Sequence, residues 1–113
     1  MKRYNLEFYV IRFDFNKRKV YNFNIFDNYY VYKYTVEHVK EFLDGKITYD
    51  ELKEKIRKDI LCEEWSRYEY EISVGAPFEE DAEKLQKIDC YYQALPNLDL
   101  IVDMCIRKIK EDN

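Results

Sequence analysis

The chain has 113 residues, of which 47% are hydrophobic and 37% charged, and its formal net charge is −4. This apolar content excludes a disordered chain, and the two glycines and two prolines exclude a collagen-like or low-complexity one. No apolar run approaches the ~18 residues that a membrane span needs, and the start of the chain lacks the features of a signal peptide. We therefore expect one domain over residues 1–113 with no membrane association.

The first predicted element is a β-hairpin. Residues 6–15 are rich in aromatic and β-branched side chains, residues 16–18 form a polar break, and residues 19–26 alternate between two faces. Such alternation is typical of a hairpin with one core face. The expected core face carries Tyr9, Ile11, Phe13, Phe15, Tyr21, Phe23 and Ile25.

A first helix is predicted after the hairpin, although its start is ambiguous. Residues 27–34 fit either an extension of the strand or the beginning of the helix. Thr35 is a plausible N-cap, because apolar residues recur at helical spacing after it. Gly45 is the expected C-terminal stop.

A second helix follows directly. Thr48 and Glu51 match a capping box, in which each side chain satisfies the backbone amide of the other residue. The helix is expected to end near Trp65, and its apolar stripe consists of Leu52, Ile56 and Ile60.

The last third of the chain predicts a strand and a long helix. Residues 67–74 alternate without interruption, and residues 89–110 carry an apolar stripe that Pro96 either kinks or restarts. The sequence therefore predicts an α+β fold with a three-stranded antiparallel sheet. About three helices are expected to pack on the sheet face that holds Tyr9, Phe23 and Tyr70.

The residues that carry chemistry are sparse. Cys62, Cys90 and Cys105 form no CxxC pair, so we expect buried, reduced thiols and a cytoplasmic protein. His38 is the only histidine and has no partner at metal-ligand spacing. Hydrolase and nucleotide-binding motifs are missing from the sequence, so we expect no cofactor, no metal and no enzyme. A Cys–His pair that only the fold brings together stays open.

The charge is divided unevenly along the chain. Residues 1–60 carry 13 bases and 10 acids, net +3, whereas residues 61–113 carry 6 bases and 13 acids, net −7. Most of the excess acid lies in residues 63–83. A negative electrostatic field repels phosphate and favours a partner with a basic surface. A solvated acidic face would, however, have the same composition.

Two groups of residues are candidates for binding a partner. Trp65 and Arg67 could anchor an interface, or Trp65 could lie in the core while Arg67 neutralises Glu69 or Glu71. The two glutamates share one face of the predicted strand, where they could do acid–base work or bind a hard cation, or simply face solvent. The second group is Tyr29, Tyr30, Tyr32 and Tyr34 with Lys33, which could stack nucleobases, meet a protein, or pack the first helix.

Two segments resemble a known family. Residues 62–72 (CEEWSRYEYEI) are similar to a recurrent WS(K/R)xE(Y/W)EI pattern, and residues 87–100 to its companion KIDVYxQ…NxD. Both are typical of small, mostly uncharacterised proteins of phages and other mobile elements. The chain departs from the family at Tyr68, where Cys is common, and at residues 74–77, where a DWP-like turn is common. The resemblance implies no catalytic residue.

These observations favour a non-enzymatic mobile-element accessory protein that binds another protein. By analogy with proteins of such origin, the partner could be a bacterial anti-phage defence protein, and the chain an anti-CRISPR-like inhibitor of it. One alternative is a small nucleic-acid-binding module that uses the tyrosines and the basic first half. A second is a carboxylate- or metal-dependent enzyme built on Glu69 and Glu71. Homodimerisation is compatible with all three.

Overall fold

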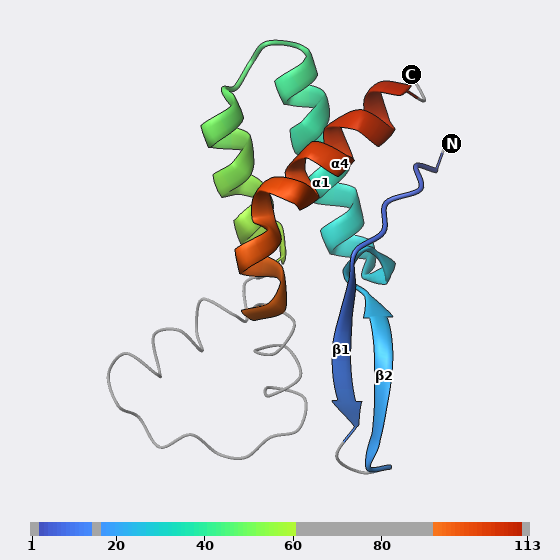
Figure 1. Cartoon of the computed structure of the whole chain (residues 1–113). Helices are drawn as coiled ribbons and strands as arrows, with labels where there is room; N and C mark the ends of the chain where they lie inside the picture. Colours follow the sequence, from blue (N-terminus) through green and yellow to red (C-terminus); the bar gives the residue numbers. More distant parts are fainter. Residues whose placement is uncertain (1–2, 15–16, 61–91, 112–113) are drawn as a thin grey trace.

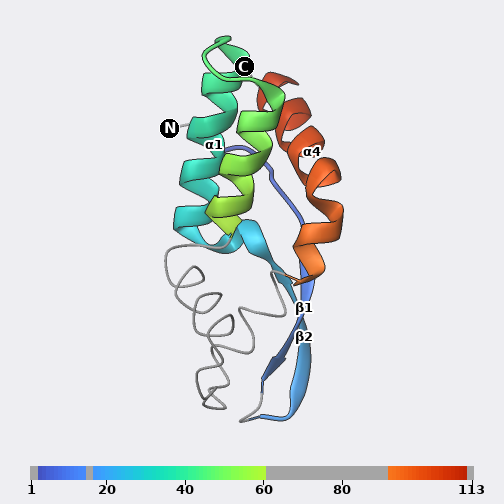
Figure 2. The same ribbon diagram turned by 90° about the vertical axis from the view of Figure 1, so that its left-hand side faces the viewer.

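A β-hairpin and three helices make up most of the computed structural model, which describes residues 3–14, 17–60 and 92–111 (Figure 1). The hairpin extends away from one end of the helical part, and the three helices lie side by side (Figure 2). The described chain is therefore mixed α+β, as predicted. The elements are β1 (Tyr9–Asp14), β2 (Lys19–Asn24), η1 (Ile25–Asp27), α1 (Tyr29–Leu43), a helix over residues 49–60, η2 (Leu95–Asn97) and α4 (Leu98–Glu111).

The two strands pair in a register that overturns the predicted core face. Tyr9 lies opposite Asn24, and Val10 lies opposite Phe23. Directly opposed residues of an antiparallel pair share a face, so Tyr9 and Phe23 lie on opposite faces. Val10 is 1% exposed, whereas Tyr9 is 58% and Ile11 56% exposed. The alternation within each strand shows which residues share a face, but it does not show which face is buried or how the strands are aligned.

The third strand predicted over residues 67–74, including Tyr70, lies outside the described residues. Within the described chain the sheet is two-stranded and antiparallel, and the third strand stays a prediction. The predicted Tyr9–Phe23–Tyr70 packing face is wrong, because Tyr9 and Phe23 lie on opposite faces. Along the outer edge of β1, the side-chain amide of Gln93 accepts from the Ile11 amide at 2.6 Å and donates to the Ile11 carbonyl at 2.8 Å. The side-chain amide of Gln93 thus pairs with the backbone of β1 as the backbone of a neighbouring strand would.

The N-cap of helix α1 lies seven positions before the predicted one. The cap is Asn28, whose Oδ1 accepts from the amides of Tyr30 at 2.9 Å and Val31 at 3.2 Å. Thr35 is therefore not a cap but a fully buried residue in the middle of the helix, and its hydroxyl has no hydrogen-bond partner among the described residues. The sequence prediction was wrong because Asn28 is itself a strong N-cap residue, which lets the helix start upstream.

The C-terminus of α1 confirms the predicted stop at Gly45. This glycine has φ of +77°, the left-handed conformation that closes many helices. The amide of Gly45 bonds the Phe42 carbonyl, and the amide of Lys46 bonds the Glu41 carbonyl, each at 3.0 Å. These are the paired bonds of a Schellman motif, and they turn the chain toward the next helix.

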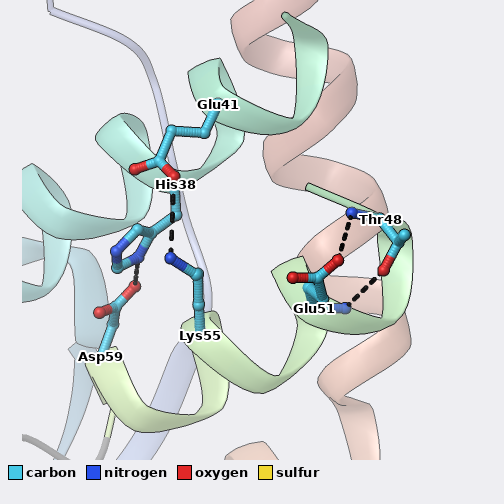
Figure 3. A network of polar contacts seen from close by, with 6 residues as sticks. All are labelled: His38, Glu41, Thr48, Glu51, Lys55 and Asp59. Carbon is cyan, nitrogen blue, oxygen red and sulfur yellow. Dashed lines mark hydrogen bonds and ion pairs between the residues drawn. The ribbon is translucent and has the colours of Figure 1, made fainter. Parts of the chain in front are cut away.

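The capping box of the second helix is also confirmed. The Thr48 hydroxyl accepts from the Glu51 amide, and the Glu51 carboxylate accepts from the Thr48 amide, both at 3.2 Å (Figure 3). Leu52 and Ile56 are fully buried, as the apolar stripe predicts, and Ile60 is partly buried.

The long final helix is interrupted at Pro96, as one of the two alternatives foresaw. Residues 92–94 are helical, η2 contains the proline, and α4 starts at Leu98. The predicted stripe is buried from Leu98 onward, but Tyr92 and Leu95, before this break, are 60% and 38% exposed. Cys105 is a free, fully buried thiol, and burial raises its pKa to about 12.

Asn24 joins the amino-terminal segment to the rest of the fold. Its Oδ1 accepts from the amides of Phe8 at 3.0 Å and Phe26 at 3.1 Å, and its Nδ2 donates to the Leu6 carbonyl at 3.1 Å. Only 8% of this residue is exposed, so its polar atoms are almost entirely satisfied by protein. The core around it and between the helices includes Tyr4, Leu6, Val10, Ile25, Phe26, Val31, Val39, Leu52, Ile56, Ile101, Val102 and Ile109. Among the described residues, no helix has the length and apolar character that crossing a bilayer requires.

Candidate interaction surface

Three tyrosines on the first turns of α1 form an exposed aromatic group, which we call the tyrosine surface: Tyr29, Tyr30 and Tyr34. Tyr29 and Tyr30 are each 64% exposed, and Tyr34 is 43% exposed. The ring centroids of Tyr29 and Tyr30 lie 5.6 Å apart in an edge-to-face arrangement, and those of Tyr30 and Tyr34 lie 6.5 Å apart and nearly parallel. These are favourable ring geometries.

The α-helical spacing explains this arrangement. Tyr30 and Tyr34 are four residues apart and therefore neighbours on the helix surface. The buried side of the same helix is formed by Val31, Thr35 and Val39. The Tyr rings thus point away from the core because the apolar and β-branched residues between them face it.

Charged residues flank the tyrosine surface. The Lys33 ammonium lies 5.9 Å from the centre of the Tyr34 ring, a cation–π distance. Asp27 precedes the helix, and Glu37 continues the stripe of Tyr30 and Tyr34 by one turn; both are exposed. Among the residues that the structure describes, neither acid forms an ion pair. The immediate surroundings are therefore aromatic and carry charges of both signs.

Tyr32 does not belong to this surface. Its hydroxyl accepts from the backbone amide of Tyr4 at 2.8 Å, and the Arg3 guanidinium lies 4.8 Å from the centre of its ring. It is partly buried and packs against the core. Of the four tyrosines in the candidate group, Tyr29, Tyr30 and Tyr34 lie together on the outside of α1, whereas Tyr32 holds the amino-terminal segment against the helix.

The other predicted binding residues, Trp65, Arg67, Glu69 and Glu71, lie outside the described residues, as does most of the acidic stretch over residues 63–83. Their proposed role in meeting a basic surface, and the alternative role of the two glutamates in catalysis or cation binding, stay predictions. In the described part of the chain, His, Cys, Asp and Glu side chains form no group of three that could hold a metal ion.

A second polar feature, which the sequence analysis missed, joins α1 to the helix over residues 49–60. His38 Nδ1 lies 2.6 Å from Asp59 Oδ2, and their side chains are 20% and 9% exposed (Figure 3). Burial raises the pKa of Asp59 to about 6, although the hydrogen bond and charge of His38 act in the opposite direction. Beside this pair, Lys55 Nζ lies 3.7 Å from Glu41 Oε2.

The sequence did contain a signal for this pair. Asp59 follows Leu52 by seven residues and Ile56 by three, which places an acid at the margin of the apolar stripe. His38 stands in the same relation to Val31 and Thr35 on α1. Two polar residues at core-facing positions of adjacent helices are expected to pair with each other, because an unpaired buried charge is costly. Among the described residues, His38 hydrogen-bonds only Asp59.

A cavity of about 330 Å³ lies between the helix over residues 49–60 and the start of α4. Four of its five charged lining residues form two pairs: Lys53 Nζ lies 2.8 Å from Asp99 Oδ1, and Arg57 makes two bonds to the Glu54 carboxylate. Nearby, the Tyr49 hydroxyl donates to Asp103 Oδ1 at 2.9 Å, and burial together with that bond raises its pKa to about 12. The Lys53–Asp99 and Tyr49–Asp103 contacts cross-link two helices, whereas the Arg57–Glu54 pair lies within one.

No family model, curated protein or solved structure matches this chain.

Proposed function

We propose that the chain is a non-enzymatic protein that acts by binding another protein, and that the tyrosine surface supplies the anchoring side chains. The observation that carries this proposal is the exposure of Tyr29 and Tyr30, at 64% each, in a group whose rings already contact each other. Tyrosine is enriched in binding hot spots, because it offers a large amphipathic area at low entropic cost.

The polar features of the described residues support binding over catalysis. Of the charges around the cavity, Lys53 is paired with Asp99 and Arg57 with Glu54, and His38 and Asp59 form a closed pair between two helices. Neither arrangement places a nucleophile beside a base, which acid–base or covalent catalysis would need. Both arrangements serve to hold helices together.

The sequence resemblance to mobile-element proteins supports a narrower proposal about the partner. Proteins of that origin and size often bind and disable host proteins, so we propose a bacterial anti-phage defence protein as the target. We propose a cytoplasmic site of action, where such a target would be found.

Affinity capture followed by purified binding measurements tests the proposal. The tagged chain is used to capture proteins from a bacterial lysate, and the captured protein is then purified and titrated. The triple variant Tyr29→Ser/Tyr30→Ser/Tyr34→Ser is expected to bind at least about 100-fold more weakly, because it removes a central aromatic group. The matched control is Tyr9→Ser, which removes a tyrosine of similar exposure, 58%, from the hairpin.

Two outcomes would contradict this function. In one, no protein is retained, or the folded triple variant binds as tightly as the wild type. In the other, the wild-type chain binds single-stranded RNA with a steep salt dependence and the triple variant does not; this result would favour the nucleic-acid alternative.

A further inference from the structure

We infer that the outer edge of β2 binds an extended, acidic segment of a partner protein, which adds to the hairpin as a further strand. This inference goes beyond the proposed function, because it concerns a surface other than the tyrosine surface. Two features of the hairpin that lie side by side carry it: backbone groups that point to an open edge, and a group of exposed bases.

The pairing of the two strands determines which backbone groups face this edge. The Phe8 carbonyl accepts from the Ile25 amide at 2.9 Å, and hydrogen-bonded pairs alternate with non-hydrogen-bonded ones along an antiparallel ladder. Asn22 therefore lies opposite Ile11 in a non-hydrogen-bonded pair, and Val20, two residues earlier, lies in another. The amide and carbonyl of each of these residues point away from the neighbouring strand.

The two outer edges of the hairpin differ in how these groups are used. On β1, the outward amide and carbonyl of Ile11 both bond the side-chain amide of Gln93, at 2.6 and 2.8 Å. On β2, the outward groups of Val20 and Asn22 have no hydrogen-bond partner among the described residues, and both residues are exposed. No described helix or strand runs along this edge (Figure 1).

The β2 edge also lacks the features by which edge strands commonly resist pairing, which are charged side chains, proline and bulges. After Lys19, β2 contains neither a charged residue nor a proline, and its register with β1 is uninterrupted. A peptide backbone supplies a donor and an acceptor at every second residue, which matches Val20 and Asn22. Phosphate oxygens of a nucleic acid only accept hydrogen bonds, so they would leave the two outward carbonyls unsatisfied.

The charge of the hairpin favours an acidic segment. Residues 9–24 contain four bases and one acid, net +3. Lys17, Arg18 and Lys19 are exposed at the turn and the start of β2, and the single acid, Asp14, lies opposite Lys19. A segment antiparallel to β2 would end beside these bases, so its acidic residues should lie at its carboxyl end.

An NMR titration with synthetic peptides tests this inference. The probe is Thr-Val-Thr-Val-Thr-Glu-Glu-Glu with both ends blocked, and it is expected to shift the backbone amides of β2 and not those of α1. Two further peptides are N-methylated at alternate residues, one for each alternate set. The peptide whose methyl groups face β2 should bind at least about tenfold more weakly than the other, because it loses backbone hydrogen bonds. Equal affinities of the two, or no shift in β2, would overturn the inference.

Val20→Pro tests the edge from the side of the protein. It removes an outward amide without removing a bond to β1, so the folded variant should bind the probe at least about tenfold more weakly. Val20→Thr is the matched control, because it changes the side chain and keeps the amide. Equal binding by the two folded variants would contradict the inference, and the methylated peptides decide the matter if Val20→Pro does not fold.

Arg18→Asn/Lys19→Gln tests the charge preference and should weaken binding about fivefold. Asparagine is chosen because Arg18 has φ of +51°, a conformation that asparagine tolerates. Arg107→Gln/Lys110→Gln is the matched control, because it removes two exposed bases from α4. Equal weakening in the two double variants would overturn the inference, because it would show attraction to net charge alone.

Two further outcomes would assign the β2 edge or the peptide elsewhere. Self-association of the wild type that Val20→Pro abolishes would make a second copy the occupant of the edge and overturn the inference. Tyr29→Ser/Tyr30→Ser should bind the probe as the wild type does; a loss would place the peptide on the tyrosine surface instead. The captured partner tests the proposed function separately, so either proposal can fail without the other.

Discussion

The helical part and the hairpin of this protein use apolar residues in different ways. Between the helices, Val39, Leu52, Ile56 and Ile109 are completely buried. On the hairpin, by contrast, Val10 is buried, while residues of equal apolarity on the opposite face remain more than half exposed, including Tyr9, Ile11 and Val20. The comparison teaches that apolar character alone does not identify the core of this chain. The exposed aromatic and aliphatic residues are available for contacts that the fold does not need.

The largest expected difference between the two regions is in stability. Replacing the fully buried Ile56 by Ala should lower the free energy of unfolding by about 2–5 kcal/mol, because it leaves a cavity between helices. Replacing Ile11 by Ala, at 56% exposure, should change it by less than about 0.5 kcal/mol. Urea denaturation of both variants measures the difference. Equal losses of unfolding free energy in the two variants would show that the hairpin face carrying Ile11 is covered.

A second prediction concerns the junction between the two regions. Asn24→Ala should cost about 2–3 kcal/mol, because it leaves the buried amides of Phe8 and Phe26 and the Leu6 carbonyl without their partner. Asn22→Ala, an exposed position on the same strand, is the control. Thermal and urea unfolding should both separate the two variants. If Asn24→Ala lost as little stability as Asn22→Ala, this side chain would not hold the hairpin to the rest of the fold.

The His38–Asp59 pair predicts a pH dependence within the helical part. The folded pKa of Asp59 is about 6, above its ordinary value of 3.8. A raised pKa favours the folded state fully below the ordinary value, and that contribution is lost as the pH rises through 6. Relative to Asp59→Asn, the wild-type protein should therefore lose on the order of 2 kcal/mol between pH 4 and pH 7.

Urea unfolding across that pH range measures the Asp59 effect, and His38→Gln serves as a second variant. Because the bond and charge of His38 hold the pKa of Asp59 down, their removal should move the transition to higher pH. If the free energy of unfolding changed with pH in the wild type as it does in Asp59→Asn, the Asp59 carboxyl group would not be desolvated.

The smallest predicted effect is a gain in stability within α1. Thr35 is fully buried and its hydroxyl has no partner in the part of the chain that the structure describes, so Thr35→Val should raise the free energy of unfolding by about 1 kcal/mol. Valine keeps the branched shape of threonine and replaces the hydroxyl by a methyl group. A loss of stability in the same urea assay would show that the hydroxyl is bonded in solution.

Local signals in the sequence predicted several features correctly. The capping box of Thr48 and Glu51 and the stop at Gly45 are confirmed, because each depends on a few neighbouring residues and their backbone chemistry. For residues 27–34 the sequence left strand and helix open, and the structure has the helix from Tyr29 onward. The predicted cap at Thr35 and the packed face of the hairpin were wrong. Competing caps and strand register are decided by contacts between distant segments, which a single sequence does not display.

The residues of the candidate site likewise differ in how far the sequence alone predicts them. The cluster containing Tyr29 and Tyr30 could be recognised from spacing alone, but the different position of Tyr32 could not, since it depends on the backbone of Tyr4. The His38–Asp59 pair bridges two helices and is separated by 21 residues in the chain. Only the packing of those helices brings its two polar residues together.

One comparison tests the central claim that the tyrosine surface serves binding and not folding: the stability of Tyr29→Ser/Tyr30→Ser measured beside its affinity for the captured partner. We predict an unfolding free energy within about 0.5 kcal/mol of the wild type, as for exposed positions elsewhere, together with loss of binding. A variant that unfolds far more easily, or one that keeps both its stability and its partner, would contradict the account.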